Sequence, residues 1–283
     1  DTFTATAGAL TISDLGVGGV NDTVTVADGA SVIATMTGAW TAQVATLNRG
    51  SLPADFRIDT GAFDVDLDLS NVGTASTDGF FVQSTGASVV TGSDGNDTIT
   101  NTSGTMSATG GAGADAIVGL TGVVDTVYYS ADSDAGTAGT LAAAQGDTIT
   151  TWLTGTDKLG FIGDYLTGSM VGTTTNAVEL IANTGGVDFD VAGVDVVIRI
   201  AGGGATANTA DLFTIADLQT AIGTLTNVAS GDERILIFEA GTDDIAAIYK
   251  FTSSAANNTL DAGELQLLGT IADKGFNADI VFA

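Results

Sequence analysis

The sequence predicts a mostly β protein that begins with a parallel β-solenoid and ends with a β-rich module containing one short helix. Three observations support this fold class. From residue 1 to about residue 130, short alternating apolar stretches are separated by turns rich in Gly and Asp. A nine-residue motif repeats in phase over residues 92–118, and one amphipathic helical pattern follows after residue 200. Short strands between closely spaced turns are typical of coiled sheets.

The composition excludes several classes of function. The 283 residues include no Cys and no His. The chain therefore has no disulfide framework, no thiol nucleophile, no Ser-His-Asp triad and no His-ligated zinc. No apolar run approaches the roughly 18 residues of a membrane helix, so membrane insertion is not expected.

The chain is strongly acidic. Asp and Glu number 34 against 7 Lys and Arg, which gives a formal net charge of −27. This charge repels a phosphate backbone, so nucleic acid is not an expected partner. All but four of the acids are Asp, a short carboxylate that suits turns and the direct ligation of hard cations such as Ca²⁺.

We expect the solenoid to occupy residues 1–130. Residues 23–26 and 63–69 alternate between apolar and polar side chains, as half-buried strands do. No amphipathic helix is expected before residue 130. The chain begins at Asp1 without a basic and apolar leader, and we interpret it as a mature or truncated chain.

The repeats are clearest over four consecutive nonapeptides. Residues 92–100 and 110–118 are full copies with the pattern Gly-x-x-Gly-x-Asp-x-Ile-x. Residues 101–109 are a degraded copy with Met106 in place of the acid, and residues 119–127 are a faded copy with Asp125 one position late.

This pattern resembles the RTX calcium β-roll repeat, Gly-Gly-x-Gly-x-Asp-x-apolar-x. The resemblance implies a right-handed parallel β-roll in which two nonapeptides form one coil, so that residues 18 apart stack. It also implies calcium between stacked turns, held by carboxylates and backbone carbonyls. The edge around Met106 is expected to bind no ion or to bind one weakly. The implied metal site consists of Gly92, Asp94, Asn96 and Asp97 facing Gly110, Ala112, Ala114 and Asp115.

A second interpretation needs no metal. In a metal-free β-helix, Asp and Asn cap turns by hydrogen bonding to nearby backbone. We favour calcium for Asp97 and Asp115, and backbone capping for Asp22, Asp78 and Asp125.

Three acids alternate along one strand face at Asp64, Asp66 and Asp68. A solvated face is the preferred interpretation of this row. A face bridged by ions, or a contact between subunits, is the alternative.

We expect residues 131–283 to form a capping, secretion and assembly module. Residues 147–161 resemble the strand-turn-strand segment that follows the repeats in RTX proteins, with Trp152 and Phe161 as core plugs. One or two strands are expected in 187–200. A helix is expected over 214–223, capped by Thr214 and ended by Gly223. An antiparallel meander is expected over 234–239, 246–252 and 265–271.

Two C-terminal segments carry weaker patterns. Residues 253–264 resemble part of an EF-hand loop ending at Glu264, but two of the expected carboxylates are missing, which favours a turn capped by Asn and Asp. Residues 277–283 form an acidic and then apolar tail. This tail resembles the C-termini of RTX proteins exported by type I secretion, and an ordinary final strand is the alternative.

These features predict a secreted, calcium-dependent structural protein that self-assembles at the cell exterior as a surface-layer or surface-filament subunit. Gram-negative surface-layer proteins resemble this composition. The expected partners are further copies of the chain and cell-surface polysaccharide. The alternative is an RTX adhesin or a glycan- or ice-binding module. The C-terminal part of a secreted carbohydrate-active enzyme is a less favoured interpretation, and we expect no catalysis within the chain.

Overall fold

The computed structural model describes residues 1–16, 22–61, 64–73, 78–130, 134, 139–162, 178–181, 189–190, 196–200, 208–226, 228–241, 243–255, 258–272 and 280–282. These residues are mostly β, as predicted, with one α-helix among them. The chain divides into two compact units. Unit 1 comprises Asp1–Tyr129 and Ile149–Leu159, and unit 2 comprises Ser130–Thr148 and Gly160–Ala283.

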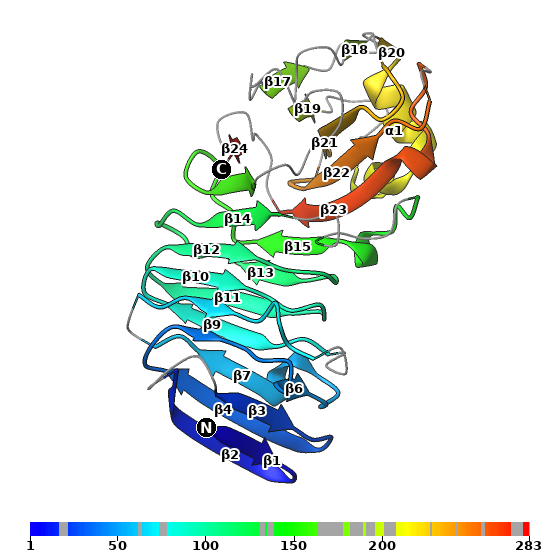
Figure 1. The fold of residues 1–283 in the computed structure, drawn as a ribbon. Coiled ribbons are helices and arrows are strands. Elements are labelled where there is room, and N and C mark those ends of the chain that lie inside the picture. The colour runs from blue at the N-terminus through cyan, green and yellow to red at the C-terminus, as the bar shows by residue number, and fades with distance from the viewer. Residues whose placement is uncertain are drawn as a thin grey trace. The chain divides into compact units, whose positions relative to one another are not determined.

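Unit 1 is built from short strands that pair in parallel (Figure 1). The first sheet has the order β13-β11-β9-β7-β4-β2, the second β14-β12-β10-β8-β5, and the third β1-β3-β6. In the first sheet the bounds are β2 Gly8–Leu15, β4 Ala30–Met36, β7 Phe56–Asp59, β9 Phe81–Thr85, β11 Thr98–Ser103 and β13 Ala116–Val118. In the other two they are β5 Trp40–Thr41, β8 Leu67–Asp68, β10 Ser88–Thr91, β12 Met106–Thr109, β14 Thr126–Tyr129, β1 Thr2–Ala5, β3 Thr23–Val26 and β6 Leu47–Asn48.

The predicted 18-residue stacking is confirmed around the repeats. Ile99 of β11 pairs with Ile117 of β13, and Ser88 of β10 pairs with Met106 of β12. Positions with the same place in successive repeats therefore lie next to each other on neighbouring strands.

The register places the apolar side chains in rows that point inward. In the first sheet the row consists of Ile12, Ala34, Ile58, Val82, Ile99 and Ile117, each at most 3% exposed. In the second sheet it consists of Trp40, Leu67, Val90, Ala108 and Val127. Because side chains alternate along a strand, their sequence neighbours point outward, which accounts for the period-2 pattern of the sequence.

The strand expected over 63–69 is shorter than predicted. Only β8, Leu67–Asp68, forms a ladder, and Phe63 lies outside the described residues. Alternation alone marks a strand face but does not fix where pairing begins, so the sequence overestimated its length. The one helical element among the described residues before 130 is the short 3₁₀ turn η1 (Pro53–Asp55), so the described part contains no α-helix there.

Unit 2 contains an antiparallel meander, as predicted. Strand β21 (Glu233–Glu239) pairs with β22 (Ala246–Thr252), which pairs with β23 (Leu265–Ile271). Strand β19 (Val196–Ile200) pairs in parallel with both β21 and β17 (Val178–Ile181), and β18 (Phe189–Asp190) pairs with β20 (Leu225–Thr226). The remaining elements are β15 (Asp147–Thr150), β16 (Lys158–Phe161), β24 (Ile280–Phe282) and the 3₁₀ turns η2 (Ala143–Gln145), η3 (Thr209–Phe213) and η4 (Ala262–Glu264).

The predicted helix is α1, Ile215–Ile222, and Gly223 ends it with a φ of 75°. Leu218 and Ile222 are buried with strand residues such as Phe238 in one apolar cluster. The Thr214 side chain does not cap the helix, because its hydroxyl donates to the carbonyl oxygen of Ala210 at 3.4 Å. No helix among the described residues has the length and apolar character needed to cross a bilayer.

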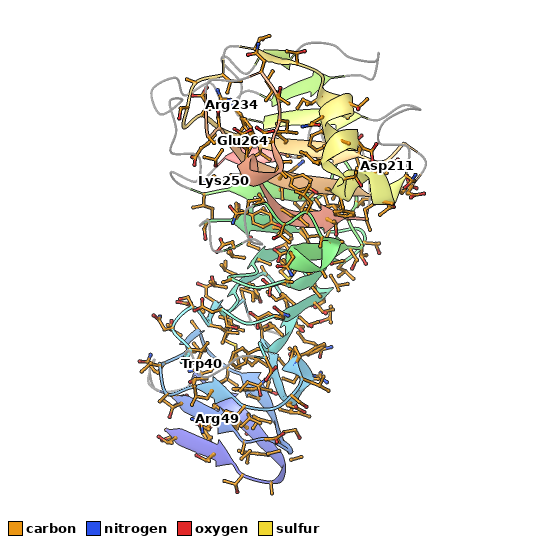
Figure 2. All side chains as sticks on the ribbon, turned by 90° about the vertical axis from the view of Figure 1, so that its right-hand side faces the viewer. Trp40, Arg49, Asp211, Arg234, Lys250 and Glu264 are labelled. Atoms are coloured by element: carbon orange, nitrogen blue, oxygen red, sulfur yellow. The ribbon has the colours of Figure 1, made fainter. Side chains whose placement is uncertain are left out.

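The meander also buries charge. Lys250 and Glu233 form an ion pair of 3.2 Å between Nζ and Oε1, with Lys250 3% exposed. Arg234 and Glu264 are buried as well, and Figure 2 labels both together with Lys250. Buried charges of this kind are found in folded proteins when they have partners.

Candidate calcium turns and buried aspartates

The two full repeats form turns that lie directly on one another, as the sequence predicted. The N–H of Ala116 donates to the carbonyl oxygen of Asp97 at 2.9 Å, and the N–H of Ala114 donates to Oδ1 of Asn96 at 3.0 Å. The structure thus brings together the two sets of residues that were predicted to face each other, 92–97 and 110–115.

Glycine is required where the turns touch. A Cβ on Gly92 would lie 1.8 Å from the carbonyl oxygen of Gly110 and 2.6 Å from Oδ2 of Asp97. Gly111 has a φ of +96°, and a Cβ there would lie 2.1 Å from the carbonyl oxygen of Ser93. The first two positions of the repeat are therefore set by close approach of backbone and by a left-handed conformation.

The Asp97 carboxylate points into unit 1 and accepts hydrogen bonds from backbone. Its Oδ2 accepts from the N–H of Ser93 at 2.6 Å, and its Oδ1 accepts from the N–H of Phe80 at 2.5 Å. The Ser93 hydroxyl donates to the same carboxylate at 3.0 Å. Burial raises the pKa of Asp97 to about 7, against the opposing effect of these hydrogen bonds. The donors from Ser93 and Phe80 therefore offset part of the cost of burying this group, and burial remains the larger effect.

Asp115 makes the same kind of bond between turns one turn later. It is 2% exposed, and its Oδ1 accepts from the N–H of Asp97 at 2.7 Å. The other predicted ligands differ from this pair. Asp94 and Asn96 are exposed, whereas Gly110, Ala112 and Ala114 offer a cation only their backbone carbonyls.

The fit of this site to calcium was judged from its donor groups. Calcium takes six to eight oxygen ligands at about 2.3–2.6 Å. In the described turns, the Asp97 oxygens and Oδ1 of Asp115 each accept a hydrogen bond from a backbone N–H group, which leaves fewer lone pairs for a cation. These three oxygens therefore fit hydrogen-bond capping better than a calcium shell. Calcium binding at the turns stays a prediction.

A second pair of buried aspartates lies on the edge where the repeat is degraded. Oδ1 of Asp125 accepts from the N–H of Met106 at 2.9 Å, and its Oδ2 accepts from the N–H of Leu120 at 2.7 Å. Oδ1 of Asp157 accepts from the N–H of Asp125 at 2.9 Å, and its Oδ2 accepts from the N–H of Leu153 at 2.7 Å. The capping role predicted for Asp125 is confirmed.

Sequence reasoning missed the role of Asp157. One signal was available, because Gly155, Asp157 and Leu159 have the same spacing as Gly95, Asp97 and Ile99 of the repeat. The turn that Asp157 closes connects the expected strands β15 and β16, which are confirmed.

Asp22 caps backbone in the same manner, as predicted. Its Oδ2 accepts from the N–H of Gly16 at 3.0 Å, and its Oδ1 accepts from the amino group of Asp1 at 2.7 Å. Residues 17–21, which precede Asp22, lie outside the described residues. Asp78 is half-buried, and its capping role stays a prediction.

Two acids of this row accept hydrogen bonds from backbone N–H groups. Oδ1 of Asp64 accepts from the N–H of Ala87 at 2.9 Å, and Oδ1 of Asp68 accepts from the N–H of Ser70 at 2.9 Å. Asp66 is exposed. The geometry agrees with the preferred interpretation of a solvated face.

The segment that resembled an EF-hand loop uses its glutamate to bind the chain itself. Oε1 of Glu264 accepts from the N–H of Ser254 at 2.8 Å, and its Oε2 accepts from the N–H of Asp261 at 3.1 Å. Glu264 is 3% exposed. The segment is a capped turn, but the sequence favoured Asn and Asp as its capping residues and the structure uses Glu264.

The proposed core plugs are both buried. Trp152 of unit 1 is 8% exposed and Phe161 of unit 2 is 3% exposed. At the C-terminus, β24 is a short strand, while residues 273–279 and 283 lie outside the described residues.

Comparison with known proteins gives no match. No protein-family model matches the chain, and none of the curated proteins matches it. The function is therefore argued from the geometry of the chain itself.

Proposed function

We propose that the chain is a structural subunit that self-assembles at the cell exterior, as a surface layer or a surface filament. We further infer that unit 1 is a right-handed RTX-type β-roll. The 18-residue parallel register and the glycine contacts between stacked turns support this inference.

One observation carries the proposal of self-assembly. The outward side chains of β10, β12 and β14 form a face without charge on a chain of net charge −27. This uncharged face consists of Val89, Thr91, Ser107, Thr109, Thr126 and Tyr128, all of them exposed or half-buried, and it ends at Asp68 of β8, which pairs with Thr91.

The physical argument concerns repulsion between copies. Two strongly acidic molecules repel each other over most of their surfaces, and the repulsion is least where neither presents a charge. Val89 is 50% exposed and adds apolar area that contact with a second copy would bury. The uncharged face is therefore the surface over which we expect copies to meet.

Calcium enters this proposal as an ion of the external medium. Divalent cations near a polyanion lower its self-repulsion, and the exposed carboxylates of Asp94 and Asp66 are accessible to them. Secretion by a type I system is part of the same proposal and is motivated by the resemblance of residues 277–283.

The test is assembly of the full chain, measured by sedimentation and electron microscopy over a range of protein concentrations, with calcium and with a chelator. We expect ordered assemblies that grow with concentration and form more readily with calcium. Thr109→Asp, which adds charge to the uncharged face, should reduce assembly. Thr98→Asp on the outward face of the first sheet is the matched control. A chain that stays monomeric under every condition would contradict the proposal.

A glycan-binding module is the second candidate. Thr91 pairs with Thr109, and Ser107 pairs with Thr126, so hydroxyl groups lie side by side on the uncharged face next to the aromatic ring of Tyr128. Such a face suits sugars, which bind through hydroxyl hydrogen bonds and stacking on aromatic rings. A monomer that binds cell-surface polysaccharide, and loses that binding on Tyr128→Ala, would favour this function over self-assembly.

A further inference from the structure

We propose that two aspartate ladders hold the turns of unit 1 together without a bound metal ion. The first ladder consists of Asp97 and Asp115, and the second consists of Asp125 and Asp157. The inference does not rest on the proposed function, since it concerns how unit 1 folds and not what it binds.

The ladders follow one hydrogen-bonding rule. In Asp97, Asp125 and Asp157, one carboxylate oxygen accepts from a backbone N–H four or five residues earlier, in the same turn. The other oxygen accepts from a backbone N–H in the turn stacked below, which belongs to Phe80, Met106 and Asp125 respectively. Each of these three carboxylates therefore closes its own turn and fastens it to the preceding one, and Asp115 makes the second of these contacts.

The successive members of a ladder are linked through backbone. Oδ1 of Asp115 accepts from the N–H of Asp97, and Oδ1 of Asp157 accepts from the N–H of Asp125. In Asp97 and Asp125, the side chain thus caps one turn and the backbone N–H donates to the next aspartate of the ladder.

The energetic need for this arrangement comes from buried backbone. At the turns, N–H groups leave the β-ladders and would lack acceptors in the interior, at a cost of about 1–3 kcal/mol each. Hydrogen bonds to an ionised carboxylate are roughly twice as strong as neutral ones. All four ladder carboxylates are at most 2% exposed, so water does not replace them.

The second ladder decides between a metal and a capping role. The repeat motif is degraded there, with Met106 at the position of the acid, and the resemblance predicts an absent or weak ion on that edge. Yet Asp125 and Asp157 bind backbone with the same geometry as Asp97 on the edge with intact repeats. A geometry that is the same on both edges follows from the backbone and does not require calcium.

This assignment changes the expected role of calcium. If the ladders close unit 1 by themselves, calcium does not trigger its folding. Calcium then acts on a folded unit, through exposed carboxylates such as Asp94.

Residue-resolved hydrogen exchange on the full chain tests this, in calcium and in a chelator. The amide hydrogens of Phe80, Ser93, Met106 and Leu120 should be protected to a similar degree in both conditions. Asp125→Asn should speed exchange at Met106 or Leu120 by about tenfold or more, because the side-chain amide turns an N–H₂ group toward one of these two backbone donors. Exchange at Phe80 and Ser93 should not change in that variant.

Asp94→Asn is the matched control, because it removes an exposed carboxylate from the same turn as Asp97 and should leave all four amides protected. Protection that appears only with calcium would overturn the proposal, and the wild-type chain alone gives this answer if a variant fails to fold. Unchanged exchange in Asp125→Asn would also overturn it. Failure of self-assembly would leave these results intact, so the two proposals fail separately.

Discussion

The Oδ1 atom of Asp157 accepts a hydrogen bond of 2.9 Å from the backbone N–H of Asp125, across 32 residues of sequence. Between these two residues the chain leaves unit 1 over Ser130–Thr148 and then returns to it. The contact therefore fixes the returning segment, Ile149–Leu159, onto the last turn of the repeats.

This relationship predicts that Asp125 and Asp157 contribute to stability as a coupled pair. Asp157→Asn should lower the free energy of unfolding of unit 1 by about 1–3 kcal/mol, because the N–H of Asp125 or Leu153 loses its acceptor. The double variant with Asp125→Asn should differ from the sum of the single variants by about 0.5 kcal/mol or more. Denaturant unfolding followed by circular dichroism measures both quantities.

Asp66→Asn is the control for that cycle, because its carboxylate is exposed and its removal should change stability by no more than about 0.5 kcal/mol. Strict additivity of the two buried substitutions would show that the pair does not act as a unit.

The close contact at Gly92 gives a second prediction. Gly92→Ala places a Cβ 1.8 Å from the carbonyl oxygen of Gly110, and both are backbone positions that cannot move independently. We expect a loss of about 3 kcal/mol or more in unfolding free energy. Gly263→Ala is the matched change, since no atom lies within 4 Å of the added Cβ there. If Gly92→Ala and Gly263→Ala had the same melting temperature, the stacked turns would separate more easily than this geometry implies.

The inward and outward rows of unit 1 predict opposite responses to shortening a side chain. Ile99 is fully buried between Val82 and Ile117, so Ile99→Ala should cost about 2–5 kcal/mol. Val89 points outward and is 50% exposed, so Val89→Ala should change stability by about 0.5 kcal/mol or less. Urea unfolding of the two variants measures this difference, and an equal effect would contradict the observed strand faces.

Periodicity in the sequence was enough to predict the stacking of residues 92–118 and the helix α1. In the first case, copies in 18-residue phase have to align once strands pair in parallel. In the second, Ile215, Leu218 and Ile222 share one face at helical spacing. Both features depend on local patterns, which a single sequence displays directly.

The role of the aspartate at the sixth position of the nonapeptide, Asp97 or Asp115, could not be predicted in the same way. A carboxylate at that place in the turn is suited to a cation and to backbone N–H groups, and the repeat pattern is the same for both. The direction of the Asp97 side chain depends on where Phe80 of the preceding turn lies, which is a property of the stacked coils. Asp157 was missed because the excursion over Ser130–Thr148 breaks the 18-residue period.

The ion pair in unit 2 gives a fourth prediction, independent of the repeats. Lys250 of β22 lies 3.2 Å from Glu233 of β21, and both side chains are largely buried. Lys250→Met keeps most of the volume of the side chain but leaves the Glu233 carboxylate without its ammonium partner. We expect this single substitution to cost about 3–5 kcal/mol, because an uncompensated buried charge is more costly than either an intact pair or no charge.

Adding Glu233→Gln to Lys250→Met removes that charge, so the double variant should recover at least about 1 kcal/mol relative to Lys250→Met alone. The measurement is the unfolding free energy of unit 2 from denaturant titration of the full chain, at low and at high salt. Because the pair is shielded from solvent, salt should alter the difference between the variants very little. A double variant less stable than Lys250→Met would mean that Glu233 is held mainly by its other partners, and that the ammonium group of Lys250 is not what compensates its charge.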